Sequence, residues 1–250
     1  MQMKRRMMAG ALLALLTLLT GPGARAQEQP EAPKDWAKFG FYADQNEALK
    51  ATGVAPDAVF MGNSITAGWA RRDPQFFTRN NFAGRGIGGQ TTAEMLVRFR
   101  QDVLELHPKV VLIMAGTNDI AMNNGWISLE NALGNIVSMC ELAKLHGIEV
   151  ILCSVPPAFR FRWRPELEPA QTIVQFNSMI RRYAEEQGIC YLDYWSSLAD
   201  ERGGIPAKWC GDEVHPNTQC YIEVFEPLAL AAVNRVLGTQ KSYVSPLPQE

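Results

Sequence analysis

Short apolar runs alternate with longer segments of helical periodicity along most of the chain. Five runs have the length of strands and are largely apolar: AVFMG (58–62), NNFAGRG (80–86), KVVLIMAG (109–116), IEVILCSV (148–155) and ICYLDYW (189–195). Between and after them, the apolar positions of residues 93–106, 128–146, 170–187 and 217–237 have helical spacing. Apolar strands separated by helices predict a parallel sheet with both faces covered. We therefore expect a three-layer α/β/α domain built on a parallel five-stranded sheet.

The amino-terminal 26 residues have the organisation of a secretory signal peptide. Three basic residues at positions 4–6 precede the apolar stretch MMAGALLALLTLLTG, and Ala24-Arg25-Ala26 forms an A-x-A cleavage site. The stretch ends at a Gly-Pro-Gly sequence, short of the roughly 20 apolar residues that a membrane-spanning helix requires. A retained N-terminal anchor is the alternative, whereas a lipid anchor is not expected because no cysteine lies near the cleavage site. We predict an exported protein, periplasmic or extracellular, without stable membrane insertion after cleavage.

The remaining chain has the length of one globular domain. Residues 27–34 are polar and contain proline, which predicts a flexible leader. Residues 35–240 are expected to form the folded domain, and residues 241–250 a C-terminal tail. The spacing of apolar positions over residues 36–50 predicts a helix at the start of the domain.

Charge limits the classes of partner. The formal net charge of the chain is −2, and four of its basic residues fall in the predicted signal peptide, so the exported chain is more acidic. An acidic balance argues against nucleic acid or an anionic membrane surface as the main partner.

The five cysteines are too few, for a chain of this length, to indicate a disulfide scaffold. Cys153 and Cys190 lie in strand-like runs, as core thiols do. Cys210 and Cys220 bracket a polar loop, which a disulfide between them could clamp.

Polar and glycine-rich clusters follow the predicted strands. In open parallel sheets, ligands bind beyond the carboxyl ends of the strands, where these clusters would converge. In chain order they are GNSIT (62–66), GRGIGGQTT (84–92), GTND (116–119), SVPPAFRFRWRP (154–165) and, before the last helix, GDEVHPN (211–217).

Ser64 and His215 are candidates for a nucleophile and its base. Ser64 stands between a strand and a helix, where a serine can equally be the helix N-cap. The chain has three histidines; His107 precedes the third strand and His146 ends a helix, so both are expected to be structural. His215 lies three residues after Asp212, a spacing that lets the carboxylate orient the imidazole. A surface turn or half of a metal site would fit the same D-x-x-H spacing.

Three groups could stabilise an oxyanion. The Ser64 N–H would point into the site if this residue opens a helix, and Gly89 can bring a backbone N–H close to a ligand. Asn118 offers a side-chain amide at the end of the third strand. The glycine could instead serve only a turn, and Asn118 only a helix cap.

Four segments, FMGNSITAGW, GRGIGGQTT, AGTND and DEVHPN, resemble in this order the sequence blocks of the SGNH hydrolases, also called the GDSL lipases and esterases. They extend from Phe60 to Asn217, which is most of the exported chain. The resemblance implies the flavodoxin-like fold of that family and a carboxylic ester hydrolase. The segments FYADQNEAL and VPPAFRFRWRP also resemble exported, carbohydrate-associated members.

The resemblance also implies residue roles. Ser64 would be the nucleophile, His215 its base and Asp212 the residue that orients the base, with Gly89, Asn118 and the Ser64 N–H as the oxyanion hole. Asn63 replaces the aspartate of the family's Gly-Asp-Ser motif. The oxyanion glycine could be Gly88 or Gly89; Gly89 is preferred because it directly precedes the Gln90-Thr91 pair, as in the family block. No metal or organic cofactor is required.

We therefore expect a secreted serine esterase that removes a small acyl group, acetyl above all, from a carbohydrate or a related ester. Arg160, Arg162 and Trp163 could bind the substrate, since aromatic rings stack on sugars and arginines bind anions; a solvated loop is the plainer interpretation of the same residues. One alternative is a lysophospholipase or short-chain lipase with the same catalytic residues. Another is a non-catalytic carbohydrate-binding protein on the same fold.

Overall fold

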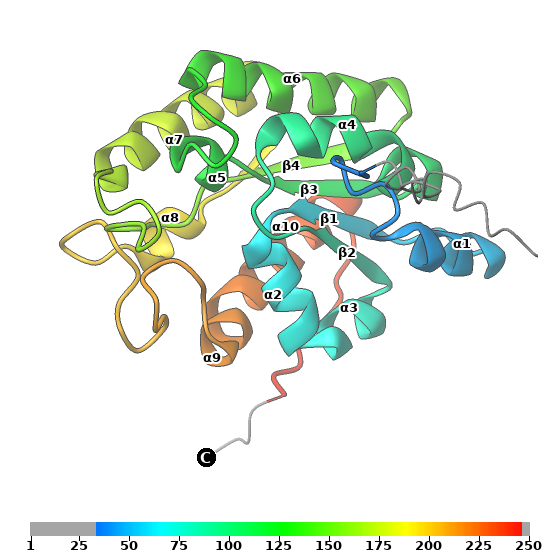
Figure 1. The fold of residues 1–250 in the computed structure, drawn as a ribbon. Coiled ribbons are helices and arrows are strands. Elements are labelled where there is room, and N and C mark those ends of the chain that lie inside the picture. Colours follow the sequence, from blue (N-terminus) through cyan, green and yellow to red (C-terminus); the bar gives the residue numbers. More distant parts are fainter. Residues whose placement is uncertain (1–33, 247–250) are drawn as a thin grey trace, which may run out of the picture. The chain divides into compact units, whose positions relative to one another are not determined.

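A parallel sheet of five strands forms the centre of the fold, in the order β2-β1-β3-β4-β5 (Figure 1). The strands are β1 (Ala58–Gly62), β2 (Phe82–Gly86), β3 (Val110–Met114), β4 (Glu149–Cys153) and β5 (Cys190–Leu192). The computed structural model describes residues 34–246, so the predicted signal peptide and nearly all of the predicted leader lie outside the described residues. The strand order 2-1-3-4-5 is the flavodoxin-like one, which confirms the predicted fold class.

Helices cover both faces of this sheet. On one side lie α4 (Thr92–Asp102), α6 (Leu129–Leu145) and α7 (Pro169–Glu186), and on the other α2 (Ser64–Arg72), α3 (Pro74–Asn80) and α10 (Glu226–Leu237) (Figure 1). The remaining helices are short: α1 (Ala43–Ala51), α5 (Thr117–Ile120), α8 (Tyr194–Leu198), α9 (Thr218–Cys220) and a 3₁₀ turn at Leu104–Leu106.

Alternate residues of the strands enter two separate hydrophobic cores. In β1, Val59 and Met61 pack with α4 and α6, whereas Phe60 packs against Trp69 of α2. Every residue of β1 is buried, which explains its continuous apolar sequence. The ring of Phe60 contacts Trp69 edge-on, with centroids 5.3 Å apart, so α2 is held firmly against the first strand.

The predicted helix over residues 36–50 is shorter than expected and begins only at Ala43. The carboxylate of Asp35 accepts hydrogen bonds from the backbone N–H groups of Phe39 (2.9 Å) and Gly40 (2.7 Å). These bonds stabilise a turn in place of the first helical turns, as short polar side chains often do.

Two further helical features differ from the sequence prediction. The expected helix over residues 217–237 contains a π-helical turn at Tyr221–Phe225, between α9 and α10. Helix α3 was not predicted, although Asp73 caps it and Pro74 opens it, which are ordinary start signals. Within residues 34–246, no helix combines the length and apolar character needed to cross a membrane.

The five cysteines are free thiols, Cys210 and Cys220 included. The loop between these two residues is therefore not clamped by a disulfide in this structure. Burial raises the pKa of the Cys220 thiol to about 12 and that of Cys210 to about 11, so both are protonated at neutral pH.

Candidate active site

Ser64, His215 and Asp212 are joined in series by hydrogen bonds at the carboxyl edge of the sheet. Ser64 Oγ lies 2.8 Å from His215 Nε2, and His215 Nδ1 lies 2.7 Å from Asp212 Oδ2. Because the ionised carboxylate can only accept, Nδ1 carries a proton and Nε2 is left to accept the serine hydroxyl. This is the geometry that lets an imidazole withdraw a proton from a serine.

Asn63, rather than Ser64, caps helix α2. The Asn63 side-chain oxygen accepts a hydrogen bond from the N–H of Ile65 at 3.0 Å, and Ser64 is the first helical residue. The serine hydroxyl is consequently not used for capping and faces His215. The alternative in which Ser64 is merely the N-cap is therefore wrong for this structure.

The carboxylate of Asp212 is held by several donors. Its Oδ1 accepts from the backbone N–H groups of His215 (2.7 Å) and Val214 (3.1 Å) and lies 3.3 Å from Cys210 Sγ. Burial raises the pKa of Asp212, but the hydrogen bonds from the His215 backbone and ring, and from Val214, outweigh it and lower the pKa to about 2. Asp212 is therefore a fixed carboxylate throughout the neutral range.

The glycine turn after β2 packs against Ser64, and Asn118 is hydrogen-bonded to the residue that follows this turn. Asn118, in the short helix α5 after β3, is buried and donates through Nδ2 to the Gln90 carbonyl oxygen at 2.9 Å. A Cβ on Gly88 would lie 3.8 Å from Ser64 Cβ, so the turn packs against the serine. Gly89 has φ +80°, a left-handed conformation that favours glycine.

The loop after β4 forms the rim, and its predicted residues are bound to other loops of the site. Arg160 and Arg162 both form ion pairs with Glu213, which has φ +72° and stands directly after Asp212. Trp163 Nε1 donates to Asn123 Oδ1 at 3.0 Å, and its ring stacks on Phe161 with centroids 5.0 Å apart.

Asn123 and Glu213 were not singled out from the sequence. Each lies in a polar turn at the carboxyl edge, and that position was the signal that could have suggested them. Their partners are 40 or more residues away in the chain, so local spacing gives no sign of the contacts.

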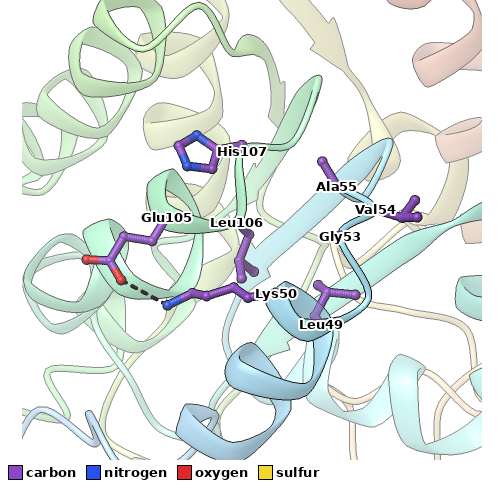
Figure 2. Close-up of a pocket in the computed structure, with 8 residues that line it drawn as sticks. All are labelled: Leu49, Lys50, Gly53, Val54, Ala55, Glu105, Leu106 and His107. Atoms are coloured by element: carbon purple, nitrogen blue, oxygen red, sulfur yellow. Dashed lines mark hydrogen bonds and ion pairs between the residues drawn. The ribbon is translucent and has the colours of Figure 1, made fainter.

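A hollow of about 330 Å³ is lined by none of the site residues described above; Figure 2 shows the residues that line it. It is lined by the end of α1, the 3₁₀ turn and the segments leading into β1 and β3, including His107. Lys50 in its wall donates to Glu105 at 3.2 Å and to Glu47 at 2.9 Å. Since the amino ends of parallel strands lie opposite their carboxyl ends, His107 is remote from Ser64. His146 Nδ1 bonds the Leu142 carbonyl at 2.8 Å, at the end of α6.

The side chains between residues 34 and 246 include no group of three or more His, Cys, Asp or Glu placed to hold a metal ion. His215 is already engaged on both ring nitrogens, by Ser64 and by Asp212. The Asp212–His215 pair thus forms part of a hydrogen-bonded series with Ser64.

The match to a family of acylhydrolases confirms the predicted enzyme class, a carboxylic ester hydrolase. The chain belongs to the GDSL-like lipase/acylhydrolase family, whose model matches residues 60–221. It is 36% identical over 180 residues to the Bacillus subtilis (strain 168) protein named uncharacterized lipoprotein YqeF, covering 59% of this chain and 74% of YqeF.

Two solved structures from Bacteroides have the same fold and substantial identity. A candidate acylhydrolase from Bacteroides fragilis is 44% identical, with a TM-score of 0.78, over 82% of this chain and 100% of that one. A GDSL-like lipase from Bacteroides thetaiotaomicron is 41% identical, with a TM-score of 0.75, over 80% and 98% of the two chains.

Proposed function

We propose that this protein is an exported serine esterase that removes an acetyl group from a carbohydrate or a related ester. The observation that carries the reaction is the hydrogen-bonded series from Ser64 Oγ through His215 to Asp212. Export is proposed from the signal-peptide pattern at residues 1–26 and from the lipoprotein name of the relative YqeF.

In the proposed reaction, Ser64 Oγ attacks the ester carbonyl while His215 Nε2 takes the hydroxyl proton. Asp212 stabilises the imidazolium that forms. The developing oxyanion accepts hydrogen bonds from the Ser64 N–H, the Gly89 N–H and Asn118 Nδ2. His215 then protonates the leaving alcohol, and water repeats the two steps on the acyl-enzyme to release the acid.

The rim supports a carbohydrate as the alcohol part. Trp163 is 43% exposed, and its ring stacks on Phe161; we propose that the exposed part of the indole contacts the sugar. Indole faces pack against sugar rings. Arg160 and Arg162 add two guanidinium groups to the same loop, where both pair with Glu213. This aromatic and cationic surface differs from the aliphatic groove that a long acyl chain would need.

A short-chain lipase or lysophospholipase is the second candidate, because the 41% identical structure is named a GDSL-like lipase. A solved acetylxylan esterase from Geobacillus stearothermophilus has the fold at 19% identity and a TM-score of 0.52, a likeness that shows the fold alone. Acetylated xylo-oligosaccharides serve as a probe for the proposed carbohydrate ester, to be compared with a lysophospholipid.

The test is hydrolysis of p-nitrophenyl acetate, butyrate and octanoate by residues 27–250, followed by acetate release from acetylated xylo-oligosaccharides. We expect kcat/KM to be highest for acetate and to fall as the acyl chain lengthens. A rate that rises toward octanoate, or faster cleavage of a lysophospholipid, would favour the lipase. If the protein hydrolyses none of these esters but binds the glycan, the non-catalytic alternative would be favoured.

A further inference from the structure

Asn123 contacts two of the three residues of the proposed oxyanion hole, Asn118 and Gly89. Its Nδ2 donates to Asn118 Oδ1 at 2.9 Å and lies 3.4 Å from the Gly89 carbonyl oxygen. The residue comes from the loop between α5 and α6 and takes no part in the proton transfer. Through these two contacts, Asn123 links the glycine turn after β2 to the side-chain amide of Asn118 after β3.

This contact and the Gln90 carbonyl together hold the Asn118 amide in one orientation. An asparagine side chain has one accepting and one donating end, which can exchange by a half-turn. Asn123 Nδ2 binds the oxygen of Asn118, while the Gln90 carbonyl binds its nitrogen at 2.9 Å. With both ends fixed, the second N–H of Asn118 is available for the oxyanion.

The orientation of Asn123 is itself fixed by the rim. Trp163 Nε1 can only donate, and it binds Asn123 Oδ1 at 3.0 Å, which turns Asn123 Nδ2 toward Asn118. The half-exposed indole is thus two hydrogen bonds away from the oxyanion donor. A sugar that stacks on Trp163 would hold the indole in place. It would thereby also hold Asn123 and Asn118, which are linked to the indole by hydrogen bonds.

We infer that Asn123 is a positioning residue that orients the Asn118 amide, and that it couples Trp163 to the oxyanion hole. The inference rests on the proposed role of Asn118. It implies that Asn123 affects turnover more than substrate binding, because the oxyanion forms only during the reaction.

The test is a double-mutant cycle on p-nitrophenyl acetate, a substrate too small to require the rim. Loss of an oxyanion donor in Asn118→Ala should lower kcat by about 100- to 1,000-fold. Asn123→Ala should lower kcat by about tenfold, since one hydrogen bond is lost, with KM changed less than about twofold. The double variant should be no slower than Asn118→Ala, because Asn123 acts through Asn118.

Two further variants separate orientation from space filling. Asn123→Asp keeps the size of the side chain but loses the donor and presents an oxygen to Asn118 Oδ1, so it should be at least as slow as Asn123→Ala. Trp163→Phe keeps a ring and loses the N–H. It should lower kcat on the aryl acetate by a smaller factor than Asn123→Ala does. Asn131→Ala and Trp36→Phe, both at exposed positions, are the matched controls.

Losses that multiply in the double variant, or an Asn123→Asp enzyme within about twofold of wild type, would overturn the inference while leaving the proposed function intact. If Asn118→Ala itself retains full turnover, the proposed oxyanion hole is wrong and the inference fails with it. Thermal unfolding of each variant shows whether a loss of rate comes from a loss of folded protein.

Discussion

Asn63 and Ser64 divide two tasks between neighbouring residues. The side chain of Asn63 satisfies the free N–H of Ile65, and Ser64 keeps its hydroxyl for His215. An aspartate, the residue of the family motif, would offer the same accepting oxygen. The departure from that motif is therefore conservative, because both side chains are strong N-caps.

We predict that Asn63→Ala lowers the free energy of unfolding by about 1 kcal/mol, the usual value of an N-cap. It should also lower kcat, because the first turn of α2 positions Ser64. Asn63→Asp is the matched control and should retain both stability and turnover. Urea unfolding and aryl acetate hydrolysis measure the two effects; an Asn63→Ala enzyme equal to Asn63→Asp would show that the cap is unimportant.

Ser64, Asp212 and His215 were predicted from the sequence because the polar segments follow the strands in order and the chain has few histidines, and the structure joins these three residues by hydrogen bonds. Asp212 and His215 lie within one short loop, so their spacing was informative. Asn123 and Glu213 could not be predicted in the same way. Their roles depend on contacts with Trp163 and Arg160, which only the folded loops bring together.

At the scale of elements, α2 is packed so closely on β2 that glycine is required at the contact. A Cβ on Gly86 would lie 2.3 Å from the Ala67 nitrogen and 2.6 Å from the Asn63 carbonyl oxygen. These are backbone atoms of the turn that carries Ser64, so they cannot move without displacing the serine. The close packing of β2 against the first turn of α2 thus fixes the position of Ser64.

We predict that Gly86→Ala lowers the free energy of unfolding by about 2 kcal/mol or more, because overpacking forces the backbone to shift. Turnover of the folded fraction should fall as well. The matched control is Gly134→Ala on the exposed side of α6, where an added Cβ meets no atom within 4 Å. That variant should gain about 0.5–1 kcal/mol from higher helix propensity. Equal stability of the two variants, measured in urea, would refute the packing argument.

The elements differ in how well their sequence predicts them. The strands of the sheet centre were predictable because burial on both faces leaves a continuous apolar run. The start of α1 was not, because the Asp35 carboxylate binds two backbone N–H groups and favours a turn. The π-helical turn at Tyr221–Phe225 was also missed, since the apolar period of residues 217–237 continues across it.

At the scale of the whole folded unit, a buried carboxyl group joins α2, α10 and the segment after α10. Glu226 Oε1 accepts from Trp69 Nε1 at 3.3 Å, and Tyr243 OH donates to Oε2 at 3.0 Å. Lys241, in the same segment, forms an ion pair with Asp57 at 2.8 Å. Residues 241–243 of the predicted C-terminal tail are thus bound to the domain.

Glu226 makes stability depend on pH. Burial raises the pKa of Glu226 to about 7, and the neighbouring Asp73 carboxylate acts in the same direction. Between pH 4.5 and 7 the unfolded chain ionises this group while the folded protein keeps it protonated. The free energy of unfolding should therefore fall as pH rises through this window, by up to about 3 kcal/mol, and level off above it.

We predict that Glu226→Gln removes this part of the pH dependence. The free energy of unfolding of the variant, relative to that of wild type, should therefore be higher at pH 7.5 than at pH 5. Urea unfolding at the two pH values gives the comparison. Glu186→Gln, at an exposed position of α7, controls for the loss of one negative charge. A wild-type protein and a Glu226→Gln variant with parallel pH profiles would contradict the prediction.

The central claim is that Ser64 is a nucleophile activated by His215. It is tested most directly by treating the protein with an aryl fluorophosphonate and locating the adduct by mass spectrometry. We predict one phosphonyl group per chain, on Ser64, with no adduct in Ser64→Ala and labelling slowed at least about 100-fold in His215→Ala. Labelling of another residue, or equal labelling of wild type and Ser64→Ala, would contradict the account.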